Sequence, residues 1–387
     1  MPTGAVLLTT AGFTRRKGSG MASVRLVNVT KRYGEIVAVD RVNLTVENGE
    51  FITLLGPSGC GKTTTLRMIA GLVEPSEGEI YFDDELMNAV PVNRRNVGFV
   101  FQSHALFPHM TVQENLAFGL KARGFPKQEI KKRIQEVLHL VEMVGFEKRK
   151  PHQLSGGQQQ RISLARVLVG DPTVLLFDEP LSSLDFNLRN TLKFQIKELQ
   201  RRTRKTAIYV THDQSEAFAI SDRIVVMDRG RIQQIGTQLD IYLRPQTPVV
   251  ANFIGSHNCF RGILTEWEPE SGLGVLDCEG LLLKVRMSEG YYPRATQDST
   301  PHRVLAYLRP EEIEILDHPE NEAYLNCFRG RIQQVIFEGS TLRVYVEVAD
   351  RILQAEVSGK KRLSFFGKEG LNVYIGFSDL TLIREKE

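Results

Sequence analysis

The chain has 387 residues with a formal net charge of +3, and 42% of them are hydrophobic and 25% charged. This length predicts two domains rather than one, and the sequence has no run of about 18 apolar residues that would span a bilayer. Residues 1–20 contain Arg15, Arg16 and Lys17 but no acid, so they hold the whole excess charge. The remaining residues are neutral overall, which argues against nucleic-acid binding.

Two further features bear on where the chain works. The apolar stretch at residues 5–8 is too short for a secretory signal, so we expect residues 1–20 to be a disordered leader. The cysteines show no CxxC spacing, which favours a reducing compartment over a zinc site or a disulfide framework. They are Cys60, Cys259, Cys278 and Cys327.

Short β-branched runs alternate with helical patterns from about residue 24 onward, which is typical of an α/β domain. Apolar residues at helical spacing predict a helical insertion over about residues 103–165. We expect the whole α/β domain to cover residues 21–245. Three runs are continuously apolar, as buried parallel strands are, and they lie at residues 51–55, 174–177 and 207–210.

A glycine-rich segment, Gly56–Thr63, follows the first of these runs and opens a helix. This is the context of a phosphate-binding loop, in which backbone N–H groups and the helix dipole face a polyanion. Lys62 is predicted to bridge the β- and γ-phosphates, and the Thr63 hydroxyl to ligate Mg²⁺. The alternative is a glycine-rich turn with an accidental lysine. The residues expected to bind phosphate are Gly56, Pro57, Ser58, Gly59, Cys60, Gly61, Lys62, Thr63 and Thr64.

A second candidate anion site lies at Ser155-Gly156-Gly157-Gln158, where a serine and two glycines stand at the mouth of a predicted helix. The orphan N–H groups of the first turn favour a negative charge there. A single chain cannot easily aim this segment at its own phosphate loop. The alternative interpretation is a polar loop that only caps the helix.

Two acids, Asp178 and Glu179, end the apolar run at residues 174–177. Asp178 is placed to hold the magnesium shell, as the second acidic element of P-loop enzymes does. Glu179 is predicted to act as general base for the attacking water. Alone, the pair is equally consistent with an ordinary exposed strand end, but the phosphate loop favours the functional interpretation.

The pattern changes after residue 254, where short predicted strands alternate with turns. The segment Asn258–Gly262, Asn-Cys-Phe-Arg-Gly, recurs as Asn326–Gly330, which predicts two related β units. Such tails form small barrels. We expect the boundary near residues 244–256 and an all-β, OB-like domain over residues 256–387.

Over residues 24–245 the chain resembles the ATP-binding-cassette (ABC) ATPases. Tyr33 matches the aromatic residue that stacks on adenine in this family, and Gln102 the glutamine that contacts magnesium and senses the membrane subunit. Ser182–Asp185 matches the loop that communicates across the dimer, with Asp185 among the nucleotide-binding residues, and His212 the histidine at the γ-phosphate. The residues expected to act in hydrolysis are Lys62, Gln102, Glu179 and His212, and those expected to hold Mg²⁺ are Thr63, Gln102 and Asp178.

The resemblance implies a RecA-like P-loop core with a helical insertion, and ATP and Mg²⁺ as ligands. Two copies would enclose two ATP molecules, each bound by one chain's phosphate loop and the other chain's Ser155–Gln158 segment. ATP then makes contacts that exist only in the closed dimer, so its binding shifts the equilibrium toward closure. Permease subunits would dock near Gln102, over residues 103–112.

The tail resembles the regulatory TOBE domain of importer ATPases, through Phe253–Gly255, the repeated segments and Leu308–Glu312. Importers of sugars, polyamines, ferric iron, sulfate and molybdate share this domain, whereas exporters usually fuse the ATPase to membrane helices. Ser256–Cys259 departs from the segment usual in the sugar branch, which disfavours a sugar.

The resemblance therefore implies a peripheral ATPase on the cytoplasmic face of the cell membrane. It would be bound to permease subunits and served indirectly by an extracytoplasmic solute-binding protein. The alternative is a soluble ABC protein acting on ribosomes or DNA, but these usually carry tandem cassettes, coiled-coil insertions or zinc cysteines. A degenerate, non-catalytic cassette is disfavoured because Lys62, Asp178, Glu179 and His212 are all present.

Overall fold

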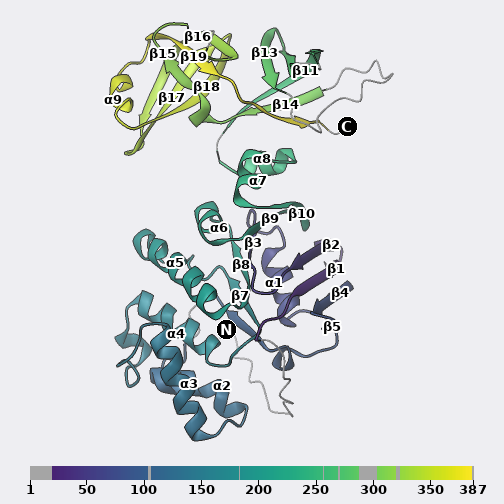
Figure 1. Ribbon diagram of the computed structural model, residues 1–387, viewed down its shortest axis with the longest axis vertical. Coiled ribbons are helices and arrows are strands. Elements are labelled where there is room, and N and C mark those ends of the chain that lie inside the picture. The colour runs from purple at the N-terminus through teal and green to yellow at the C-terminus, as the bar shows by residue number, and fades with distance from the viewer. Residues whose placement is uncertain are drawn as a thin grey trace. The chain divides into compact units, whose positions relative to one another are not determined.

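The computed structural model describes most of the chain, namely residues 20–102, 106–182, 184–255, 257–268, 271–286, 303–319 and 323–385. They form two compact units that divide between Ile241 and Tyr242, a few residues before the predicted linker (Figure 1). The predicted leader lies outside the described residues apart from Gly20, as do residues 103–105 of the predicted docking segment and Ser183. In the described part of the chain, no helix has the length and apolar character to span a membrane.

A six-stranded sheet forms the centre of the first unit. Its strands run in the order β10 (Arg231–Gly236), β9 (Arg223–Asp228), β3 (Phe51–Leu55), β8 (Thr206–Thr211), β7 (Val174–Asp178) and β6 (Val97–Val100). The strands β3, β7 and β8 are buried along their whole length and pair in parallel, as their continuous apolar runs predict. Their carboxyl ends therefore meet at one edge, where ligands bind in open α/β sheets.

A four-stranded antiparallel sheet completes the strands of this unit. Its order is β2 (Ile36–Val46), β1 (Val24–Tyr33), β4 (Glu77–Phe82) and β5 (Glu85–Leu86). The helices are α1 (Lys62–Ala70), α2 (Val112–Ala122), α3 (Lys127–Leu140), α4 (Gly156–Leu168), α5 (Phe186–Thr203) and α6 (Gln214–Ile220), with short 3₁₀ turns at Val92–Arg94 and Pro151–Gln153. Helix α7 (Gln238–Leu243) contains the division between the two units. In Figure 1, α2, α3 and α4 gather at one end of the unit, next to α5.

The two faces of the six-stranded sheet have separate cores, because successive strand residues point to opposite faces. Phe51 packs into a core with residues of α2 to α5, whereas its neighbour Ile52 packs with α1 and the antiparallel sheet. On the first face, the rings of Phe51, Phe177 and Tyr209 lie within 5.7–6.4 Å of one another. The helical insertion thus packs directly on the strands that end in the predicted site residues.

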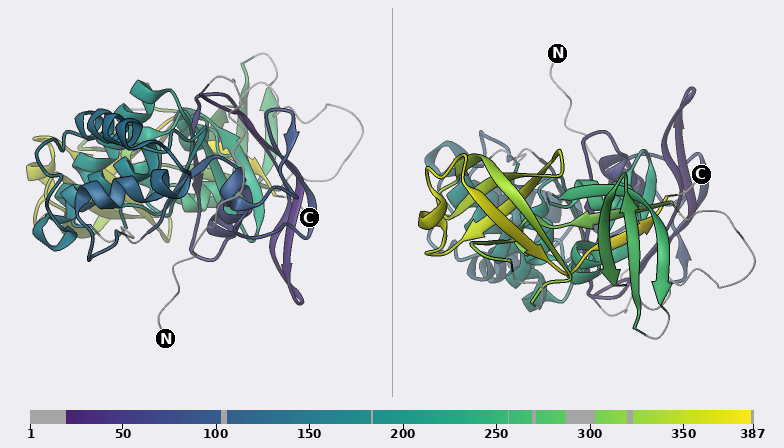
Figure 2. Two further views of the ribbon diagram at one scale, coloured as in Figure 1. Left: turned by 90° about the horizontal axis from the view of Figure 1, so that it is seen from below. Right: turned by 90° about the horizontal axis from the view of Figure 1, so that it is seen from above.

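The second unit contains two five-stranded antiparallel sheets, visible as separate groups of strands in Figure 2. One runs in the order β13 (Leu281–Arg286), β12 (Leu273–Cys278), β11 (Asn258–Glu268), β14 (Arg303–Leu308) and β20 (Thr381–Arg384). The other runs in the order β18 (Arg351–Ser358), β17 (Thr341–Val348), β16 (Asn326–Phe337), β19 (Asn372–Phe377) and β15 (Glu314–Leu316). Two short helices, α8 (Pro248–Phe253) and α9 (Arg362–Phe365), and a 3₁₀ turn at Pro310–Glu312 accompany them.

The repeated Asn-Cys-Phe-Arg-Gly segments open the central strands of these two sheets, β11 and β16. In each repeat the next two strands follow outward, and the fourth pairs on the other side of the central strand. The fifth strands are exchanged, because β15 pairs with β19 and β20 pairs with β14. The sequence repeat is therefore a repeat of architecture, with the two halves locked by exchanged edge strands.

Candidate functional site

The predicted phosphate loop lies between β3 and α1. Gly61 has a φ of 102°, in the left-handed region, and a Cβ there would lie 2.5 Å from the backbone oxygen of Ala38. A Cβ on Gly56 would lie 2.2 Å from the backbone oxygen of Met227. Side chains are thus excluded at both positions, where the loop packs closely against the backbone of Ala38 and Met227.

The amine of Lys62 lies inside this loop. It donates hydrogen bonds of 2.8 Å to the carbonyl oxygens of Gly56 and Pro57, and the residue is only 4% exposed. Burying an ammonium group is costly unless it is hydrogen-bonded. The loop therefore holds a positive charge at its centre, where the sequence places the phosphates.

Thr63 and Asp178 meet across the gap between α1 and the end of β7. The Thr63 hydroxyl donates a 2.7 Å hydrogen bond to Oδ1 of Asp178, and Nη2 of Arg67 lies 3.6 Å from Oδ2. Burial raises the pKa of the Asp178 carboxyl, and the bond from Thr63 opposes that rise. A hydroxyl and a carboxylate oxygen side by side are hard ligands that suit Mg²⁺.

These two oxygens do not form a complete metal cage. In the described part of the chain, no group of three His, Cys, Asp or Glu side chains is placed to hold a metal ion. Mg²⁺ commonly keeps several waters and takes few protein ligands beside substrate phosphates. Thr63 and Asp178 fit that pattern.

Glu179 follows Asp178 in a left-handed conformation, with a φ of 44°. For a residue other than glycine this backbone is uncommon and costs energy, so the surroundings must hold it. Its amide donates to the carbonyl of Val210 on β8, and its Oε2 lies 3.1 Å from Nδ1 of His212. The structure thus brings together the predicted base and the predicted γ-phosphate histidine.

Gln102 is connected to the backbone of Glu179 through Ser182. The Gln102 amide donates to the Ser182 hydroxyl at 3.2 Å, and that hydroxyl donates to the Glu179 carbonyl at 3.0 Å. A chain of two hydrogen bonds therefore connects the predicted permease-sensing glutamine to the backbone of the predicted base.

The Ser155–Gln158 segment forms the start of α4 and is a capping box. The Ser155 hydroxyl accepts from the Gln158 amide, and the Gln158 side chain accepts from the Ser155 amide. Gly157 packs against α5, since a Cβ there would lie 2.7 Å from Cδ1 of Leu188. Asp185 likewise caps α5 by accepting from the Leu188 amide at 3.0 Å. The local role of these residues in this chain is thus to begin two helices.

Tyr33 ends β1 and is 51% exposed, with Nζ of Lys31 5.1 Å from its ring centroid. Within the described chain, the bonds and ion pairs found for Tyr33 and for Ser155–Gln158 do not join them to the phosphate loop or to Glu179. The described contacts therefore connect one group of predicted residues and do not extend to Tyr33 or to Ser155–Gln158. This group comprises Lys62, Thr63, Gln102, Asp178, Glu179, Ser182 and His212.

Sequence reasoning missed two arginines beside this group, Arg67 and Arg189. Arg67 faces Asp178, and Arg189 contacts the turn after Glu179. No sequence signal distinguishes them, because an arginine on an amphipathic helix is usually a solvated residue. Only the fold shows which acids and carbonyls they face.

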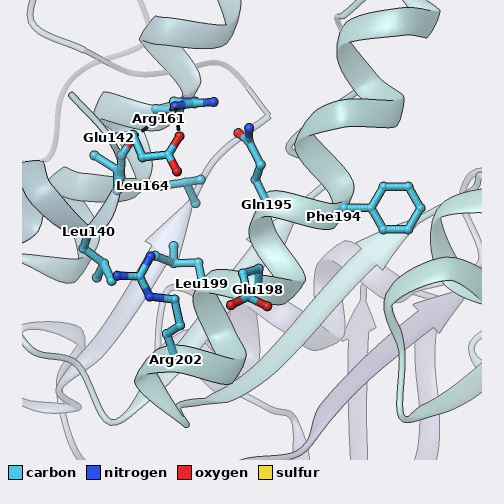
Figure 3. Close-up of a pocket in the computed structure, with 10 residues that line it drawn as sticks. Leu140, Glu142, Arg161, Leu164, Phe194, Gln195, Glu198, Leu199 and Arg202 are labelled. Atoms are coloured by element: carbon cyan, nitrogen blue, oxygen red, sulfur yellow. Dashed lines mark hydrogen bonds and ion pairs between the residues drawn. The ribbon is translucent and has the colours of Figure 1, made fainter.

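A separate cavity of about 270 Å³ lies between the C-terminal end of α3, the middle of α4 and the side of α5 (Figure 3). Arg161 and Glu142 form a 2.9 Å ion pair at one wall, and Phe194 and Arg202 also line it. None of the residues predicted from the sequence to bind ATP or Mg²⁺ lines this cavity.

Comparison with known proteins identifies the family. The ABC transporter family matches residues 39–182, and the TOBE domain matches residues 306–379. The spermidine/putrescine import ATP-binding protein PotA of Rubrobacter xylanophilus is 46% identical over 336 residues, covering 87% of this chain and 86% of that protein. The chain belongs to the ATP-binding subunits of ABC importers.

A second relative supports the same assignment. The Fe(3+) ions import ATP-binding protein FbpC of Escherichia coli is 45% identical over 324 residues, covering 84% of this importer ATPase and 87% of the relative. Among solved structures, a dimeric bacterial ABC transporter cassette shares 37% identity with a TM-score of 0.50, covering 56% of this chain and 98% of that one. A second solved structure is cbiO1 of Clostridium perfringens, part of an ABC transporter complex. It shares 28% sequence identity with a TM-score of 0.53, and the match covers 57% of this chain and 90% of that one.

These likenesses confirm the expected fold class, an α/β P-loop ATPase core followed by an all-β domain, and the expected importer type. This importer ATPase accordingly binds and hydrolyses ATP, with Mg²⁺ as cofactor. The alternative of an ABC protein acting on ribosomes or DNA is set aside.

Proposed function

We propose that this importer ATPase hydrolyses ATP with Glu179 as general base, and that a second copy of the chain completes the site. The observation that carries the proposal is the 3.1 Å contact between Oε2 of Glu179 and Nδ1 of His212. Both residues stand at the carboxyl ends of parallel strands, with β8 next to β3, from which the phosphate loop departs, and β7 next to β8. A carboxylate there reaches a water in line with a γ-phosphate held by the loop.

The remaining roles follow from the positions of the charged groups. Lys62 places its ammonium inside the loop, where it neutralises charge on the β- and γ-phosphates. Thr63 and Asp178, joined at 2.7 Å, offer the protein oxygens for Mg²⁺, with Gln102 as a further ligand. His212 orients the γ-phosphate, and its contact with Glu179 holds the two side chains next to each other.

The second copy supplies what the first lacks. In Ser155–Gln158, at the start of α4, the Gln158 amide donates to the Ser155 hydroxyl, whereas the amides of Gly156 and Gly157 have no hydrogen-bond partner within the described part of the chain. We assign this segment, with Asp185, to the ATP of a partner copy. The half-exposed ring of Tyr33 is assigned to stacking on adenine. The dimeric structure of a similar bacterial ABC transporter cassette supports a site completed by a second copy.

The cargo is assigned from the relatives. Their names specify spermidine/putrescine in one case and Fe(3+) in the other, so we propose that the complex takes up a polyamine or ferric iron. In this arrangement permease subunits dock near Gln102, at the cytoplasmic face of the membrane. An extracytoplasmic solute-binding protein delivers the cargo to them.

Uptake by cells that lack this chain tests the proposal. Deleting the gene should abolish high-affinity uptake of either radiolabelled spermidine or radiolabelled ferric iron. Expression of the wild-type chain should restore that uptake, and expression of Glu179→Gln should not. Unchanged uptake of both cargoes after deletion would contradict the assigned cargo class, and full restoration by Glu179→Gln would contradict the role of the base.

A further inference from the structure

Arg189 lies near the start of α5 and contacts two other segments of the first unit. Its Nη2 donates to the carbonyl of Leu184 at 3.0 Å and to that of Ser182 at 3.4 Å. Its Nη1 donates to Oδ2 of Asp213 at 3.4 Å, and its Nε lies 3.8 Å from Oε1 of Glu216. One planar guanidinium therefore spans two stretches of chain that neighbour the proposed site.

The first stretch is the turn that follows the proposed base. The Ser182 hydroxyl donates to the carbonyl of Glu179, and the Ser182 amide also bonds that carbonyl at 3.3 Å. Arg189 holds the carbonyls of the same turn from the other side. Since Glu179 adopts a left-handed backbone, it depends on its surroundings to keep that conformation.

The second stretch is the segment that carries His212. Asp213 follows His212 directly and caps α6, accepting from the amides of Ser215 and Glu216. Glu216 is 3% exposed and accepts a 2.8 Å hydrogen bond from the Tyr209 hydroxyl in the core. Arg189 thus ties the His212 segment to its own helix through two carboxylates, one of them fixed in the core.

We propose that Arg189 is a positioning residue that holds the Glu179 turn and the His212 segment in register for hydrolysis. It acts through these two residues, and the inference rests on the roles proposed for them above. Arginine is suited to this task because its rigid fork presents five N–H donors in fixed directions, whereas lysine presents a compact point charge. A lysine at this position keeps the positive charge beside Asp213 and Glu216 but cannot reach carbonyls and carboxylates together.

The test therefore replaces Arg189 by lysine and measures steady-state ATP hydrolysis by the full chain. Arg189→Lys should lower kcat by about tenfold or more, because small misplacements of reacting groups are costly, and leave KM for ATP unchanged. The matched control is Arg201→Lys on the same helix. The Arg201 side chain is exposed and has no hydrogen bond or ion pair among the described residues, so the kcat of Arg201→Lys should equal that of the wild type.

A double-mutant cycle with Asp213→Asn separates positioning from a general loss of stability. If both residues act through one bridge, the double variant should lose no more than about twofold in kcat beyond Arg189→Lys alone. Fully additive losses, a wild-type kcat for Arg189→Lys, or a parallel rise in KM and fall in thermal midpoint would each overturn the proposal.

The same measurements distinguish this inference from the proposed function. Glu179→Gln and His212→Ala are assayed beside the Arg189 variants. If these two lose activity and Arg189→Lys does not, the positioning role alone is wrong. If Glu179→Gln and His212→Ala retain wild-type turnover, the proposed site is wrong, and the positioning role with it.

Discussion

The imidazole of His212 lies 3.1 Å from the carboxylate of Glu179, and the two side chains come from the ends of the adjacent strands β8 and β7. This pair lies at the centre of a connected group. Ser182 joins the Glu179 carbonyl to Gln102 on one side, and Arg189 joins the turn of Ser182 to Asp213 on the other. Substitution of Gln102 or of Arg189 should therefore change the geometry of the Glu179–His212 pair.

His212→Ala tests the first member of the pair. We expect turnover to fall by about 10²-fold, the lower end of what a positioned polar group contributes to such steps. Affinity for ATP should change little, because Lys62 and the loop amides remain. The measurement is steady-state hydrolysis together with nucleotide titration, and His139→Ala, an exposed histidine on α3, is the control. Loss of binding with intact turnover would show that His212 acts on ATP capture instead.

Tyr33→Ala tests the adenine platform. A stacked aromatic contact is worth about 0.5–1.5 kcal/mol, so ATP affinity should fall by roughly threefold to tenfold. Turnover at saturation should stay near the wild-type value, since stacking stabilises ground and transition states alike. Tyr33→Phe keeps the ring and should behave as the wild type in the same titration. Equal losses for the two variants would exclude stacking as the cause.

The second unit offers a stability test at its two repeated asparagines. Asn326, at the start of β16, exchanges two 2.8 Å hydrogen bonds with the backbone of Lys284 in the other sheet. Asn258, at the start of β11 in the first sheet, likewise exchanges hydrogen bonds of 3.0 and 2.7 Å with the backbone of Gln354 on β18 in the second sheet. Each asparagine therefore clamps the opposite sheet.

Removing the Asn326 clamp takes away the side-chain partners of the partly buried backbone N–H and C=O of Lys284. Asn326→Ala should destabilise the C-terminal unit by about 1–3 kcal/mol, measured as a lower thermal midpoint, while ATP hydrolysis persists. Asn372→Ala, an exposed asparagine on β19, should leave the midpoint unchanged. Identical midpoints for both variants would show that the clamp contributes nothing.

Asp213 predicts a pH dependence of stability. Burial alone would raise the pKa of Asp213, but hydrogen bonds from Ser215, Glu216 and Arg189 outweigh burial and hold that pKa below its ordinary value of 3.8. A carboxyl with a lowered pKa in the folded state stabilises the fold fully above its ordinary pKa. This stabilisation is lost as the pH falls through the folded-state value.

Asp213→Asn keeps a helix-capping oxygen but loses the charge. It should therefore destabilise the protein by about 0.5–1 kcal/mol at pH 7. The difference in thermal midpoint from the wild type should shrink when both proteins are melted near pH 3. A difference that is equal at the two pH values would show that the charge of Asp213 has no part in stability.

Local patterns were enough to predict some of these features. The strand, the glycines at 56 and 61 and the helix that begins at Lys62 all lie within one short segment, so the sequence predicted the loop. The apolar runs likewise predicted β3, β7 and β8, because strands buried on both faces have no polar alternation. The repeat at Asn258 and Asn326 predicted two related β units.

Features that depend on distant contacts were not predicted. The exchange of β15 and β20 involves strands of three and four residues, too short for a periodic signal. Arg189 lies on a helix whose exposed positions carry many charges, so its contacts became visible only in the fold. Ser155 was predicted as part of an anion site, and the structure shows that its hydroxyl also caps α4 by accepting from the Gln158 amide.

The central claim is that Glu179 is the base of an ATP site shared by two copies, and Glu179→Gln tests it most directly. The substitution removes proton acceptance but leaves Lys62, Thr63 and Asp178 in place. The measurement is single-turnover ATP hydrolysis combined with size-exclusion chromatography in Mg²⁺ and ATP. The account predicts normal ATP binding, an ATP-dependent dimer and turnover lowered by at least about 10²-fold. A variant that binds ATP and turns it over at the wild-type rate would contradict it.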